Sequence, residues 1–206
     1  MDIQSFYYFH STTAQVLASV SALLAVFTHY KVSEIKEFLV GDGKATYERV
    51  KNKDVGYVFL DEHEKHQNRF RDAIGRRSIV GIKKEVKVLA EQERDRGETR
   101  ESKPTGLQAL YRGFEIRVAQ INNIKKYTKR SLVWALIGVM ISLLSLLCAS
   151  RIVESYGLLY FDIALITVTI LVYMVFTTLG VSEGLKDMGD VQHPSTGYTE
   201  EDSNVE

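Results

Sequence analysis

The chain has 206 residues, with 26 basic and 26 acidic side chains and no formal net charge. Hydrophobic residues make up 45% of it, but charge is unevenly placed: residues 3–30, 131–150 and 163–182 contain no Asp, Glu, Lys or Arg. A bilayer core of about 30 Å is crossed by roughly 20 apolar helical residues. Each uncharged run is therefore long enough to span a membrane, and a single soluble domain is excluded. The one cysteine, Cys148, excludes an internal disulfide framework and a multi-cysteine metal site.

The first uncharged run predicts a retained transmembrane helix over residues 12–30. No positively charged segment precedes it, it is longer than the apolar core of a secretory signal, and no small-residue cleavage site closes it. On a helical projection, one sector collects large apolar side chains: Val16, Leu17, Val20, Leu23, Leu24 and Phe27. The opposite sector is small and polar: Ser11, Ala14, Gln15, Ala18, Ser19, Ser21, Ala22, Ala25 and His29. We expect the apolar sector to face lipid and the small, polar one to face protein or water.

Two interpretations of the small, polar sector remain open. In the first, it packs against other helices, because small residues let backbones approach closely. The helix-packing candidates are then Ala18 and a matching seam in the second span that includes Gly138, Ser142 and Ser145.

In the second interpretation, several copies of the first span surround a water-filled pore. The candidate pore-lining residues are Gln15, Ser19, Ala22, Val26 and His29. Val26 would form a narrow apolar ring suited to gating. His29 would make conduction depend on pH between about 5 and 8, where an imidazole changes charge.

The segment over residues 31–130 carries 24 of the 26 basic residues, against 16 acidic ones. Positively charged loops stay on the cytoplasmic side of a membrane. We therefore predict an outside N-terminus, a cytoplasmic helical domain over residues 31–130, and a cytoplasmic C-terminus. Nucleic-acid binding is disfavoured, because no basic face with interleaved aromatic residues and no known module is present.

Within this segment the apolar periodicity predicts helices. A stripe from Val32 to Leu39 continues the first span and is expected to stop at Gly41, Asp42 and Gly43, before a short helix that contains Tyr47. An apolar patch at residues 55–60, a charged helix at 61–77, a helical stripe at 79–89 and a solvated run at 91–103 follow. A capping box at residues 105–108 then begins a helix that continues without proline into the second span.

The second and third spans are predicted over residues 131–150 and 158–181, joined by a short outer link. Asp162 is the one acidic residue inside a span. Ionisable groups within membranes are costly and are candidates for a functional role, but Asp162 lies only about one turn from the outer end of its helix. It could pair with Arg151 or His10, or reach the headgroups. Residues 182–206 are acidic and are expected to be disordered.

No catalytic motif is present, so an enzyme is disfavoured and no cofactor is expected. His63 and His66 are spaced for a metal ion, but this pair alone recurs by chance in charged helices. We therefore predict no metal site.

Residues 9–18, Phe-His-Ser-Thr-Thr-Ala-Gln-Val-Leu-Ala, resemble the opening of a set of small bacterial membrane proteins of uncharacterised function. The first span of those proteins also begins with an aromatic residue, followed by Ser or Thr, Ala-Gln and small residues. The architecture is also similar to that of SLATT-type proteins, proposed membrane-perturbing effectors of bacterial defence, in which two spans are joined to a cytoplasmic helix. The additional N-terminal span and the 100 intervening residues depart from that pattern, so no residue role is carried over.

The sequence thus predicts an all-α, multi-pass protein of the inner (plasma) membrane. Its four parts are residues 1–30, 31–130, 131–181 and 182–206. One expected function is a homo-oligomer with an ion-conducting or membrane-permeabilising role through the first span. The alternative is a membrane-anchored interaction or signalling module whose cytoplasmic domain binds a protein partner, with no pore.

Overall fold

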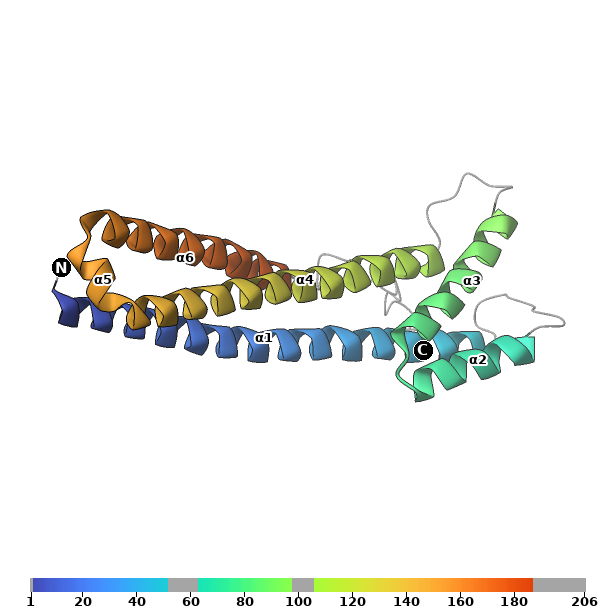
Figure 1. The fold of residues 1–206 in the computed structure, drawn as a ribbon. Helices are drawn as coiled ribbons and strands as arrows, with labels where there is room; N and C mark the ends of the chain where they lie inside the picture. Colours follow the sequence, from blue (N-terminus) through green and yellow to red (C-terminus); the bar gives the residue numbers. More distant parts are fainter. Residues whose placement is uncertain (1, 52–62, 98–105, 187–206) are drawn as a thin grey trace, which may run out of the picture. The chain divides into compact units, whose positions relative to one another are not determined.

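The computed structural model describes residues 2–51, 63–97 and 106–186 (Figure 1). Over these residues the chain is helical apart from short turns, and contains no strand. The helices are α1 (Ile3–Lys51), α2 (His63–Gly75), α3 (Ile79–Gly97), α4 (Gly106–Leu147), α5 (Ala149–Glu154) and α6 (Tyr156–Leu185).

Three of these helices, α1, α4 and α6, are long and apolar enough to cross a membrane. This confirms the prediction of an all-helical protein with three candidate spans. The described residues fall into two compact units: unit 1 comprises residues 2–33 and 120–186, and unit 2 comprises residues 34–51, 63–97 and 106–119.

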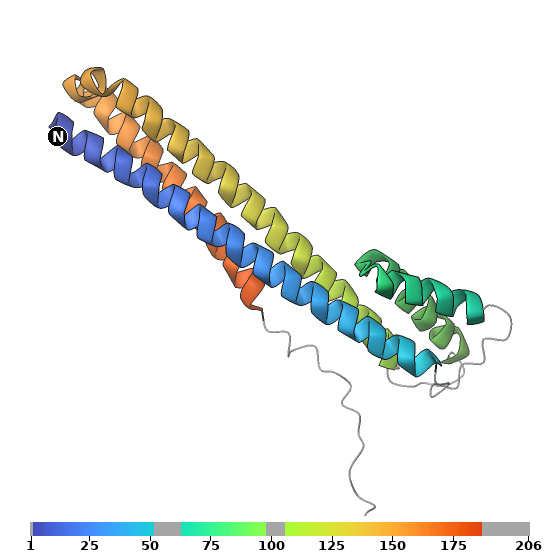
Figure 2. The same ribbon diagram turned by 90° about the horizontal axis from the view of Figure 1, so that it is seen from below.

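Unit 1 is a bundle of three helices that lie side by side in both views (Figures 1 and 2). Helix α4 runs antiparallel to α1 and α6, which are parallel to each other. Its core has one cluster formed by Phe6, Ala149 and Leu159 and a second formed by Leu17, Ala135 and Tyr173. Large apolar side chains also cover the outside of the bundle, as expected of helices that face lipid rather than water.

Helix α1 begins with a capping interaction. The Asp2 carboxylate accepts a hydrogen bond from the Ser5 backbone N–H at 2.7 Å, which satisfies one of the free donors at the start of the helix. The hydrogen bonds from Ser5 hold the pKa of Asp2 below its usual value.

The prediction that a helix stops at residues 41–43 is wrong, because α1 continues unbroken to Lys51. A glycine in a helix interior costs about 1 kcal/mol relative to alanine, which contacts in unit 2 can offset. The Asp42 carboxylate accepts a hydrogen bond from Arg117 of α4 at 2.7 Å. A Cβ atom at Gly43 would lie 2.7 Å from Ile82 Cγ2, so this glycine allows α3 to approach α1. The expected separate helix with Tyr47 is part of α1.

In unit 2, α2 and α3 form a hairpin whose turn contains Arg77 with a positive φ of 49°. The His66 ring Nδ1 lies 3.0 Å from Glu85 Oε2 across this hairpin. Arg117 is buried and stacks over the Phe38 ring, with its guanidinium carbon 3.8 Å from the ring centroid. These contacts join α2 to α3 and α1 to α4.

The continuous helix predicted from the capping box into the second span is present as α4, with 42 residues. The outer link predicted between the second and third spans is itself helical: α4 ends at Leu147, α5 follows, and the extended backbone of Ser155 (φ −109°, ψ 108°) separates α5 from α6. The apolar patch at 55–60, residues 98–103 of the solvated run, the start of the capping box at Thr105 and residues 187–206 of the tail lie outside the described residues.

Candidate functional site in the three-helix bundle

Three polar side chains, one from each long helix, meet inside one end of the bundle. His10 of α1 lies with Nε2 2.9 Å from Oδ2 of Asp162 of α6, at ion-pair distance but without the angles of a hydrogen bond. Ser145 of α4 donates a hydrogen bond to the other carboxylate oxygen at 2.5 Å. The His10 side chain is fully buried and that of Asp162 is 9% exposed.

Aromatic rings enclose the imidazole of this cluster. The Phe6 ring centroid lies 4.2 Å from that of His10, and the Phe9 centroid lies 5.2 Å away in an edge-on arrangement. Of the partners considered for Asp162 from the sequence, the structure therefore shows His10, whereas Arg151 is exposed on α5. A buried ionisable group must be paired. That rule predicted a partner for Asp162 but did not distinguish His10 from Arg151.

The His10–Ser145–Asp162 cluster can hold the three helices together, but it offers little for metal chemistry. No group of three or more His, Cys, Asp or Glu side chains able to hold a metal ion occurs in the part of the chain that the structure describes. The cluster is best understood as a set of polar contacts that joins α1, α4 and α6.

Further hydrogen bonds between side chains continue along the bundle. Ser21 and Tyr173 are 3.3 Å apart, Ser131 and Thr177 are 2.7 Å apart, and Thr28 and Thr128 are 2.7 Å apart. Sequence reasoning missed these pairs, because hydroxyl groups occur at many positions in a span and only the helix register selects which of them meet. The pairs join α1 to α6, α4 to α6, and α1 to α4.

The small-residue seam of the second span lies inside the chain's own bundle. Gly138, Ser142 and Ser145 are buried. A Cβ atom at Gly138 would lie 2.6 Å from Leu17 Cδ1 and 3.2 Å from Thr169 Cγ2, so this glycine allows α1 and α6 to approach α4 together. Ala18, the fourth packing candidate, is exposed.

The small and polar face of α1 points away from this bundle. The five candidate pore-lining residues are all exposed: Gln15, Ser19, Ala22, Val26 and His29. They lie roughly 180° around the helix from the face that is buried, which carries Phe6, His10, Leu17 and Leu24.

This arrangement corrects one expectation from the sequence. The apolar sector of the first span was expected to face lipid, but Leu17 and Leu24 of that sector are buried against the other helices of the bundle. Val16 and Leu23, at its edge, are 54% and 70% exposed. The physical reason is that the small residues of α4 create room for large side chains of α1, so large and small surfaces interdigitate.

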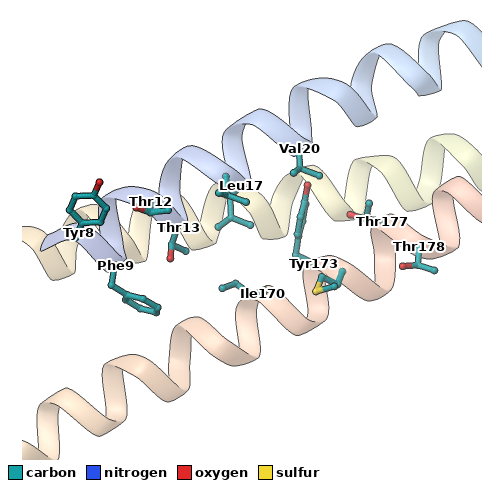
Figure 3. A pocket seen from close by; sticks show the side chains of 12 residues that line it. Tyr8, Phe9, Thr12, Thr13, Leu17, Val20, Ile170, Tyr173, Thr177 and Thr178 are labelled. Atoms are coloured by element: carbon teal, nitrogen blue, oxygen red, sulfur yellow. The ribbon is translucent and has the colours of Figure 1, made fainter. Parts of the chain in front are cut away.

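An apolar groove of about 710 Å³ lies between α1 and α6 (Figure 3). Leu17, Val20 and Tyr173 point into the space between the two helices (Figure 3). None of the twelve lining residues is charged: Tyr8, Phe9, Thr12, Thr13, Val16, Leu17, Val20, Ile170, Tyr173, Met174, Thr177 and Thr178. The groove therefore offers an apolar surface but no group suited to acid–base or metal chemistry.

No protein family matches this chain, and neither does any curated protein or solved structure.

Proposed function

We propose that several copies of the chain assemble in the plasma membrane so that the exposed polar face of α1 surrounds an ion-conducting axis. The observation that supports this proposal is the position of that face. Gln15 and His29 are exposed on a helix whose opposite face is already occupied by contacts within the chain.

The energetic argument concerns the amide of Gln15. A polar group in hydrocarbon without a hydrogen-bond partner costs several kcal/mol. Contact between copies, or water along a common axis, would remove this cost. Packing within the chain is not available to the amide, because the inner face of α1 meets α4 and α6.

The proposed orientation places the N-terminus and the α5 region outside, and unit 2 and the C-terminus in the cytoplasm. The basis is the charge distribution, with 24 of the 26 Lys and Arg residues between residues 31 and 130. The parallel course of α1 and α6, with α4 antiparallel, is compatible with three successive crossings (Figures 1 and 2).

The test is ion flux through vesicles that contain the purified chain. Val26 lies on the exposed polar face of α1 and is 68% exposed, while Val168 is 55% exposed on α6. Val26→Ser should raise the flux, because a polar side chain removes an apolar constriction. Val168→Ser makes the same chemical change on a surface assigned to lipid and should leave the flux unchanged. Equal effects of the two variants, or no flux from either Val26→Ser or the unchanged chain, would exclude the pore.

A second candidate is a membrane-anchored interaction module. The observation in its favour is the exposure of large apolar side chains on unit 2, where Val80 of α3 is 81% exposed and Ile116 of α4 is 57% exposed. This function predicts no flux, and a protein partner whose binding is lost in the Val80→Ser/Ile116→Ser variant.

A further inference from the structure

The exposed side of α4 changes its chemistry abruptly at one level of the bundle. Between residues 124 and 131 of α4, every exposed residue is basic. We call these four residues, Lys125, Lys126, Lys129 and Arg130, the basic cluster. From the next turn onward the exposed side chains are apolar: Leu132, Val133, Leu136, Ile137 and Met140. Such a boundary on one helix side is expected where a helix passes from hydrocarbon into the charged headgroup region.

The lysines of the basic cluster have no ion-pair partner among the residues that the structure describes. Arg130 contacts an aromatic ring, with its guanidinium carbon 5.6 Å from the Phe176 centroid. The acidic group on the nearby end of α6, Glu183, is already engaged by Lys186 at 2.6 Å and by Asn123 at 3.3 Å. The cluster therefore presents positive charge that the described fold does not neutralise.

The backbone that carries the basic cluster is held firmly. Thr128, between Lys126 and Lys129, is hydrogen-bonded to Thr28 of α1, and Ser131 is hydrogen-bonded to Thr177 of α6. A Cβ atom at Gly180 would lie 3.5 Å from Tyr127 Cβ, so α6 approaches α4 closely at this level. The inner side of α4 is fixed by these contacts, and the basic side chains are directed outward.

The opposite end of the bundle has a different composition. Exposed tyrosines mark it, with Tyr8 and Tyr156 each 77% exposed and Tyr160 71% exposed. The exposed Arg151 of α5 is accompanied by the exposed acid Glu154. Tyrosine side chains favour either membrane interface. A group of Lys and Arg side chains without ion-pair partners favours the interface that carries negatively charged lipids.

We propose that the basic cluster binds the phosphate groups of anionic phospholipids in the leaflet at this end of the bundle. The long lysine side chains extend along the helix and place their ammonium groups among the headgroups. The exposed apolar side chains from Leu132 to Met140 contact the acyl chains of the same lipids. Each lysine near an anionic surface contributes about fivefold to binding, so the cluster selects anionic over zwitterionic lipid.

The experiment uses the full chain in vesicles of phosphatidylcholine with a minor fraction of phosphatidylglycerol. Spin-labelled versions of each lipid report how strongly the chain retains one over the other. The test variant is Lys125→Gln/Lys126→Gln/Lys129→Gln, and the matched control is Lys44→Gln/Lys65→Gln/Lys84→Gln. The control removes the same charge from exposed lysines of unit 2.

We expect the unchanged chain and the control to prefer phosphatidylglycerol, and the test variant to lose at least about fivefold of that preference. Replacing the same three residues by arginine should retain it. The preference should also weaken as salt shortens the screening length from about 30 Å to about 3 Å. Circular dichroism checks that the test variant and the unchanged chain fold equally well. If they do, and the test variant is as selective as the unchanged chain, the proposal is overturned.

Inorganic phosphate separates a lipid site from a site for a free anion. Phosphate added at the same ionic strength as a chloride control should not displace the labelled phosphatidylglycerol further than chloride does. Specific displacement by phosphate would assign the basic cluster to a soluble anion and overturn the lipid proposal.

Discussion

Ser142 and Ser145 lie on the same buried side of α4, yet only one of them has a hydrogen-bond partner. Ser145 donates to Asp162, whereas the Ser142 hydroxyl has no partner among the described residues. Ser145→Ala should lower the free energy of unfolding by about 1–2 kcal/mol, because it leaves a buried carboxylate with one donor fewer. Ser142→Ala should change it by less than about 0.5 kcal/mol or raise it. Unfolding titrations in mixed detergent would measure both, and equal losses would contradict the assignment of the hydrogen bond between Ser145 and Asp162.

Glu115 on α4 offers a test of a single charge in unit 2. Its carboxylate accepts a hydrogen bond from the Tyr111 hydroxyl at 2.8 Å and lies 3.3 Å from Lys83 Nζ. The Tyr111 hydrogen bond, followed by the interaction with Lys83, holds the pKa of Glu115 below its usual value of 4.5. Because the pKa of Glu115 is lower in the folded chain than in the unfolded chain, its ionised form stabilises the fold at pH values above the unfolded-state pKa. This stabilisation is lost as the pH falls through the folded-state pKa.

Tyr111→Phe removes the hydrogen bond that contributes most to the lowered pKa of Glu115. This pKa should rise toward 4.5 but stay below it, because Lys83 remains beside the carboxylate. A titration of the Glu115 side-chain carbon by NMR would measure the shift. An unchanged pKa would show that the hydroxyl does not reach the carboxylate in solution.

Single residues also show where sequence reasoning reached its limit. The charge of Asp162 within an uncharged run identified it as a residue that needs a partner. The choice between His10 and Arg151 depends on the register of α1 against α6, which is set by packing rather than by any local pattern. The exposure of Gln15 and His29 is likewise a property of three helices together.

At the scale of elements, the two glycines of α1 near its C-terminal end give a matched pair. Gly41 has open space around the position of a Cβ atom, whereas Gly43 faces Ile82. Gly41→Ala should raise stability by up to about 1 kcal/mol, because alanine favours the helix. Gly43→Ala should lower it by roughly 1–3 kcal/mol, because the added methyl group displaces α3. Thermal unfolding would measure both, and a helix that broke at these residues would respond equally to the two changes.

A second prediction concerns how closely α1 and α4 approach each other. Gly138→Ala places a methyl group against Leu17 and should destabilise the bundle by about 1–3 kcal/mol. Leu17→Ala alone should also destabilise it, by leaving a cavity. The double variant should lose less than the sum of the two, with a coupling of at least about 0.5 kcal/mol. Additive losses would place the two side chains out of contact.

The elements themselves could be predicted from the sequence to a large extent. Uncharged runs identify α1, α4 and α6 because hydrocarbon excludes charge, and that signal is strong. The expected break at residues 41–43 was wrong because glycine is also placed where two helices touch, and the sequence does not distinguish the two uses. The short helix α5 was missed because six residues give no usable period.

At the scale of the whole molecule, the orientation can be tested by labelling. In a Cys148→Ser background, cysteines introduced by Asp2→Cys and Glu154→Cys should react with a membrane-impermeant maleimide added to intact cells. A cysteine introduced by Arg76→Cys, an exposed position of unit 2, should react only after the membrane is opened. The reverse pattern would place the basic segment outside and remove the charge argument for the topology.

The contact between His10 and Asp162 has a consequence for how the protein is made. The two residues are 152 positions apart in the sequence. A ribosome adds about 5–20 residues per second, so roughly 8–30 s separate their synthesis. During that interval the first helix exists without the Asp162 carboxylate that later pairs with its imidazole. Ser145 and Asp162, by contrast, are synthesised within seconds of each other and meet within one helical hairpin. Until Asp162 has been made, His10 of the new N-terminal helix therefore depends on water, headgroups or a helper protein. The duration of this interval is set by the order of translation and not by the strength of any contact.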